Sequence, residues 1–101
     1  MDVVKVGRDL RKLMERLDGR LAERLPPRQL KSYWSYLNAG ERTELLDVLC
    51  ATLVKRQIPV TLEERGILAE ILSMYTDPDP RYTYVADPAG VLAQLEVSSG
   101  S

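Results

Sequence analysis

Residues 38–64 read NAGERTELLDVLCATLVKRQIPVTLEE, and this stretch decides the fold. Within it, apolar residues recur at helical spacing and form one broad face: Leu45, Leu46, Leu49, Leu53 and Val54. A helix with such a face has to bury it against other helices. We therefore expect the stretch to hold the end of one helix, a tight turn, the central helix of a bundle and the start of the next helix.

The flanking sequence predicts the other helices. Asp2 can cap the first helix, and Leu25 ends it because a residue that precedes a proline resists helical geometry. Thr61 and Glu64 have the spacing of a capping box, in which each side chain bonds the other residue's backbone N–H. We expect helices over residues 3–24, 27–37, 40 or 41 to 56, and 62–75, with a short last helix after Asp87 and Pro88.

The expected fold is therefore all-α, a small bundle of four main helices plus a short C-terminal helix. One domain covers residues 1–97, and residues 98–101 form a flexible tail. Apolar positions of the fourth helix that are available for burial include Leu62, Leu68 and Ile71. Residues 81–85 have strand-like composition but no ladder partner, so we expect an extended segment across the bundle. Trp34 is expected in the core, with an exposed binding anchor as the alternative.

Composition argues against several classes of enzyme. The chain of 101 residues has one cysteine, Cys50, and no histidine, which speaks against a zinc site and against nucleophile systems that need histidine. The carboxylate pairs Glu63/Glu64 and Asp77/Asp79 have capping or turn contexts that explain them without acid–base chemistry. We expect no enzyme activity, catalytic residue, cofactor or metal. No long apolar run follows the first basic residues, so we expect neither a signal peptide nor a membrane span, and we expect a cytoplasmic location.

Charge is distributed unevenly along the chain. Residues 1–31 hold nine lysines and arginines against five acidic residues, while residues 32–101 hold five against ten. In the second part, Glu41, Glu44 and Asp47 lie three apart on one side of the central helix. They can complement the helix dipole or form an acidic ridge for a basic partner, and both interpretations stay open. A DNA-reading role for this helix is disfavoured because its carboxylates would face phosphates.

Several of these motifs together resemble the small helical Maf-type immunity proteins, which accompany secreted polymorphic toxins of bacteria. The resemblance covers roughly residues 20–75. It consists of Leu25-Pro26, Asn38-Ala39-Gly40-Glu41, the leucine pattern of residues 45–53, Ile58-Pro59-Val60-Thr61, and Glu64. The first helix and the segment after Tyr75, which contains prolines and tyrosines, depart from the family pattern.

The resemblance implies a cytoplasmic inhibitor that binds a cognate toxin domain, of nuclease type, and blocks its active site or substrate groove. Two surfaces are candidates for toxin binding. One consists of Glu41, Glu44 and Asp47, and the other of Asp77, Asp79, Tyr82 and Tyr84. Packing of the two tyrosines over the bundle is the alternative for the second surface.

A different class of function also stays open. The first helix carries Arg8, Arg11, Lys12 and Arg16, so the chain could be a regulatory or interaction module that binds nucleic acid or an acidic protein. The mixed signs along this helix favour a solvated surface instead. Homodimerisation through leftover apolar surface is a third possibility.

Overall fold

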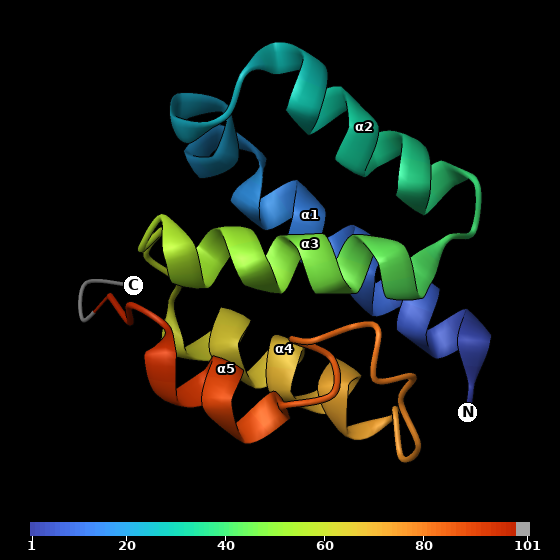
Figure 1. Ribbon diagram of the computed structural model, residues 1–101. Helices are drawn as coiled ribbons and strands as arrows, with labels where there is room; N and C mark the ends of the chain where they lie inside the picture. The colour runs from blue at the N-terminus through green and yellow to red at the C-terminus, as the bar shows by residue number, and fades with distance from the viewer. Residues whose placement is uncertain (99–101) are drawn as a thin grey trace.

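The computed structural model describes residues 1–98 and is an all-α bundle (Figure 1). Its five helices are α1 (Val3–Arg24), α2 (Pro27–Asn38), α3 (Arg42–Lys55), α4 (Leu62–Ser73) and α5 (Pro88–Gln94). Residues 1–98 contain no β-strand, only one parallel bridge between Val60 and Val97. The expected fold class of four main helices and a short last helix is confirmed.

Helix α1 forms as its sequence predicts. The Asp2 side chain accepts the backbone N–H of Lys5 at 3.0 Å, which caps the first turn. The helix ends before Leu25, whose backbone is extended (φ −114°, ψ 144°) ahead of Pro26. Its apolar stripe is at most 1% exposed at every position: Val6, Leu10, Leu13, Met14, Leu17 and Leu21.

Helix α3 is the central helix expected within residues 38–64, and α1 shares this central position. α3 contacts α1, α2 and α5, while α1 contacts α2, α3 and α4. Figure 1 shows α1 passing behind α3, with α2 on one side and α4 and α5 on the other. The buried residues of α3 are Leu45, Leu46, Leu49, Cys50, Thr52 and Leu53.

The connection from α3 to α4 closes one end of the bundle. Ile58 and Val60 are buried, as expected for a segment that covers helix ends. The capping box that opens α4 is present, with both reciprocal bonds between Thr61 and Glu64 formed. Val60 also pairs with the C-terminal segment: its N–H donates to Glu96 O at 2.8 Å, and the Ser98 N–H donates to Val60 O at 2.7 Å. Ser98 is therefore held to the domain, and the rest of the expected tail, residues 99–101, lies outside the described residues.

Two expectations about local structure are wrong. Residues 81–85 are not extended but form turns, in which Tyr82 N–H donates to Asp79 O and Ala86 N–H to Tyr82 O. Leu62 is 69% exposed, whereas Glu64 is 1% exposed. Residues two apart on a helix point about 200° away from each other, so the inward turn of Glu64 directs Leu62 outward.

Helix α2 buries fewer of its apolar side chains than the sequence pattern predicted. Tyr33 and Leu37 are buried, but Leu30 and Trp34 are only half-buried against the core. Trp34 is neither fully in the core nor an exposed anchor, the two interpretations that the sequence allowed. Its indole Nε1–H donates to Asp18 Oδ1 at 2.8 Å. Its polar edge is therefore held by α1.

Candidate partner-binding surface

The two surfaces proposed from the sequence lie side by side. The turn-rich connection between α4 and α5 runs beside the start of α3 (Figure 1). Thr43 Oγ1 in the first turn of α3 donates to the Tyr75 hydroxyl at 3.4 Å, and the Tyr82 hydroxyl donates to Glu44 Oε1. We call the combined area the α3–connection surface, defined by Glu41, Glu44, Asp47, Asp77, Asp79, Tyr82 and Tyr84.

Asp47 holds the connection in place and is not an open part of an acidic ridge. Its Oδ1 accepts two successive backbone N–H groups, from Tyr84 at 2.9 Å and from Val85 at 3.1 Å. Val85 is fully buried in the core. The carboxylate thus replaces the ladder partner that residues 81–85 lack, because it satisfies backbone donors that would otherwise be unpaired beside the core.

Tyr82 and Tyr84 are half-buried and pack against the core, as the alternative interpretation expected. The hydrogen bond from Tyr82 to Glu44 raises the pKa of the Tyr82 phenol. The Tyr84 ring lies 5.8 Å from Lys55 Nζ, and the Tyr82 ring lies 5.8 Å from the Arg81 guanidinium carbon. Both rings are thus fixed in position while part of each side chain remains exposed to solvent.

The remaining carboxylates of the surface differ in whether they already have a bonding partner. Asp79 Oδ2 accepts Arg81 Nε at 2.9 Å, and this bond is the main cause that lowers the Asp79 pKa. Glu41 and Asp77 are exposed, and neither side chain has a hydrogen-bond or ion-pair partner within residues 1–98. These two are therefore available for a partner without breaking an existing contact.

The sequence pattern did not predict one buried cluster of charged side chains. Glu64 forms a 3.1 Å ion pair with Arg16 Nε and a 2.7 Å ion pair with Arg20 Nη1, which joins α4 to α1. Burial alone would raise the Glu64 pKa, but hydrogen bonds from Arg20, from the Thr61 N–H and from Arg16 lower it to about 2. The capping box identified the local role of Glu64, but only the packing of α4 on α1 brings the arginines to it.

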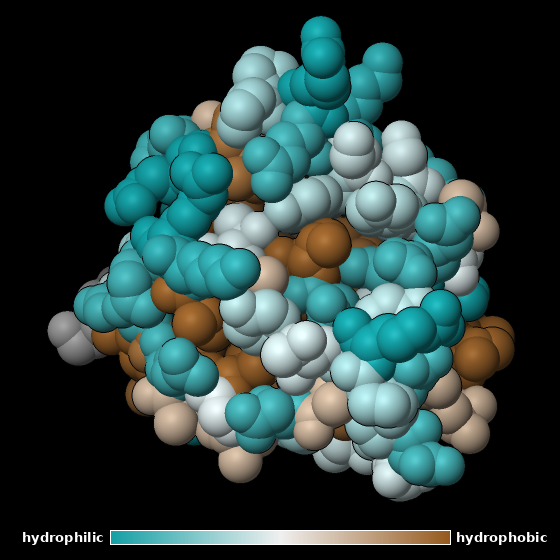
Figure 2. Space-filling model, in the orientation of Figure 1, coloured by the Kyte–Doolittle hydropathy of each residue, from teal (hydrophilic) through white to brown (hydrophobic). Residues whose placement is uncertain are grey.

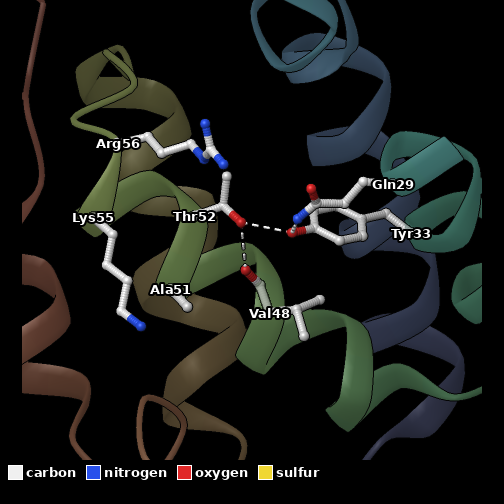
Figure 3. Close-up of a pocket in the computed structure, with 7 residues that line it drawn as sticks. All are labelled: Gln29, Tyr33, Val48, Ala51, Thr52, Lys55 and Arg56. Carbon is white, nitrogen blue, oxygen red and sulfur yellow. Dashed lines mark hydrogen bonds between the residues drawn. The ribbon is translucent and has the colours of Figure 1, made fainter. Parts of the chain in front are cut away.

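A groove of about 270 Å³ between α2 and α3 was also not anticipated (Figure 3). Figure 3 shows Gln29 and Tyr33 of α2 facing Thr52 of α3. Gln29 Nε2 donates to the Tyr33 hydroxyl at 3.2 Å, the Tyr33 and Thr52 hydroxyls are 2.6 Å apart, and Thr52 Oγ1 donates to Val48 O at 2.9 Å. These bonds use the hydroxyl donors within the bundle, so we assign the network to helix packing.

Two other kinds of chemical site, a reactive cysteine and a metal site, receive no support from the structure of residues 1–98. Cys50 is fully buried, and burial raises its thiol pKa to about 12, so the reactive thiolate is disfavoured. Within residues 1–98, no group of three or more His, Cys, Asp or Glu side chains could hold a metal ion. In the same part of the chain, none of the helices combines the length and apolar character needed to span a membrane.

The basic residues of α1 are only partly free. Arg16 pairs with Glu64 and also lies 3.5 Å from Glu63, and Arg11 Nη2 donates to Asn38 Oδ1 at 3.1 Å. The side chains of Arg8 and Lys12 are exposed and have no such partner within residues 1–98. The basic surface of α1 is therefore smaller than the sequence suggested.

Comparisons of the chain with protein-family models, with curated proteins and with solved structures find no match. The resemblance to immunity proteins and its implied function stay predictions.

Proposed function

We propose that this chain is a binding protein that neutralises a partner, as an immunity protein neutralises its cognate secreted toxin, and that the α3–connection surface is where the partner binds. The observation that carries the proposal is the union of two separately suspected segments on one surface, joined by Tyr82 to Glu44 and by Tyr84 and Val85 to Asp47. The resemblance of residues 20–75 to Maf-type immunity proteins supports the inhibitor role.

The chemistry of the surface suits a basic partner. Carboxylates outnumber cations there: Arg81 and Lys55, which lies beside the Tyr84 ring, face five acidic residues, Glu41, Glu44, Asp47, Asp77 and Asp79. Asp47 is already bonded to the connection, so the other four carry the acidic character that a partner would meet. A nuclease-type toxin domain has a cationic substrate groove, and an acidic surface would both steer association and cover that groove. Half-buried tyrosines that are already held in place lose little conformational entropy on binding, which favours them as anchors.

The experiment must separate binding from folding, so it should not begin with the tyrosines, which pack against the core. We would reverse the two unpartnered carboxylates with the double substitution Glu41→Lys and Asp77→Lys. The matched control is Glu15→Lys with Glu23→Lys, which makes the same charge change at exposed α1 positions without side-chain partners in residues 1–98. All three proteins should show the same helicity.

The affinity-tagged chain is expressed in its native host, and the proteins recovered with it are identified by mass spectrometry. We expect a stoichiometric basic protein domain whose toxicity the chain suppresses on co-expression. The Glu41/Asp77 double variant should bind this domain at least about tenfold more weakly, while the control should bind normally. Recovery of only the chain itself or of nucleic acid would refute the inhibitor role, and equal loss in both variants would refute the surface.

A further inference from the structure

A second hollow, of about 420 Å³, lies between the first turns of α1 and the corner where α2 meets α3. Its walls carry three arginines and no carboxylate, together with two apolar residues and a glycine: Arg8, Arg11, Arg42, Val4, Leu37 and Gly7. The volume falls within the range of ordinary ligand sites. A concave site with three cations and no counterion in its lining calls for an anionic occupant.

The half-buried Arg42 side chain approaches α1 closely at this site. Its Nη1 donates to Gly40 O at 3.3 Å, but its buried Nε has no hydrogen-bond partner within residues 1–98. A Cβ atom at position 7 would lie 2.9 Å from that Nε, so Gly7 makes room for the guanidinium group. A buried N–H donor without a partner is unfavourable, and this property distinguishes Arg42 from the other two arginines of the site.

The apolar part of the site continues outward onto the start of α1. Val4 is 71% exposed, and Met1 and Val3 beside it in the chain are 66% and 49% exposed. Figure 2 shows hydrophobic residues gathered at the edge of the molecule where Figure 1 places the beginning of α1. Hydrophobic residues thus adjoin the arginines on the same end of the helix.

We propose that this arginine groove binds an acidic peptide segment of a partner protein that carries an apolar side chain among its carboxylates. Guanidinium groups bind carboxylates with paired N–H donors, and the wall formed by Val4 and Leu37 would contact the apolar side chain. Nucleic-acid phosphates would leave the apolar wall unused, and a flat membrane surface would not enter the hollow. The inference does not depend on the proposed inhibitor role, which uses a different, acidic surface.

The test uses fluorescence anisotropy with a short fluorescein-labelled peptide of glutamates around one leucine. Two control peptides replace the leucine by serine or the glutamates by lysines. The protein variants are Arg8→Gln with Arg11→Gln in the groove, and Arg28→Gln with Lys31→Gln on exposed α2 positions outside it. Both double variants remove the same charge, and neither changes the core. A fluorescein-labelled DNA duplex tests the phosphate alternative.

We expect the glutamate–leucine peptide to bind the wild-type protein, the Arg8/Arg11 variant to lose at least about tenfold in affinity, and the Arg28/Lys31 variant to lose less than about twofold. The serine peptide should bind several-fold more weakly, and the lysine peptide should not bind. The proposal is overturned if no binding occurs up to millimolar peptide, if both double variants lose affinity equally, if the leucine makes no difference, or if the duplex binds more tightly.

Discussion

Replacing Glu64 by Gln tests how much the buried charge cluster stabilises the bundle. Glu64 is 1% exposed, and Arg16 and Arg20 contact it with side chains that are about one third exposed. Glutamine keeps the shape and can still accept the Thr61 N–H of the capping box, so the substitution removes mainly the charge. It also places an amide NH₂ group against arginine donors, which cannot accept a hydrogen bond from it.

The pKa of Glu64 sets the expected magnitude. It is lowered from 4.5 to about 2 in the folded protein, and each unit corresponds to about 1.4 kcal/mol, so the ionised carboxylate stabilises the fold by roughly 3 kcal/mol at neutral pH. Because the folded-state pKa is the lower one, this contribution is present above pH 4.5 and is lost as the pH falls toward 2. Water can hydrate the exposed portions of Arg16 and Arg20 after the substitution. The loss in free energy of unfolding is therefore expected at the lower end of the range seen for broken buried ion pairs.

The assay is urea denaturation followed by far-ultraviolet circular dichroism, performed over a series of pH values. We expect Glu64→Gln to lower the free energy of unfolding by about 3 kcal/mol at pH 7, and this difference from the wild type to shrink steadily below pH 4.5. Glu63→Gln is the control, because Glu63 is 62% exposed and lies 3.5 Å from Arg16, so it should change stability by less than about 0.5 kcal/mol. A difference for Glu64→Gln that stays constant down to pH 2, or one no larger than that of the control, would refute the reasoning.

Three further predictions concern other parts of the bundle. Asp47→Ala should destabilise the protein by roughly 2–3 kcal/mol in urea denaturation, because the backbone N–H groups of Tyr84 and Val85 lose their acceptor; unchanged stability would contradict the anchoring role. Tyr33→Phe should cost about 1 kcal/mol by the same measurement, since it removes the 2.6 Å contact with Thr52, and a cost near zero would show that the network contributes nothing. Cys50 should react with iodoacetamide at mildly alkaline pH only as fast as the protein unfolds, because burial raises its pKa to about 12; rapid labelling of the folded protein, followed by mass spectrometry, would contradict this.

Local signals in the sequence determined the helices and most of their ends. Helix caps and proline stops act within a few residues, so Asp2, Leu25-Pro26 and the Thr61–Glu64 box could be recognised without any knowledge of the fold. The apolar period of 3.6 residues likewise identified the buried face of α1, because helical geometry alone places those residues on one side. Burial of Ile58 and Val60 followed from their position between two such helices.

Tertiary packing decided what the polar residues do. No local rule says that Asp47 will accept two N–H groups from residues 37 and 38 positions further along the chain. In the same way, Arg16 and Arg20 meet Glu64 only because α4 lies on α1, and that contact turns Leu62 outward. The candidate residues of the α3–connection surface could be named from the sequence, but only tertiary contacts bring them onto one surface. The arginine groove likewise exists only because α1 lies against the corner between α2 and α3. Hydrogen bonds and ion pairs between distant residues depend on how apolar burial positions the helices relative to one another, which is why the sequence alone could not specify them.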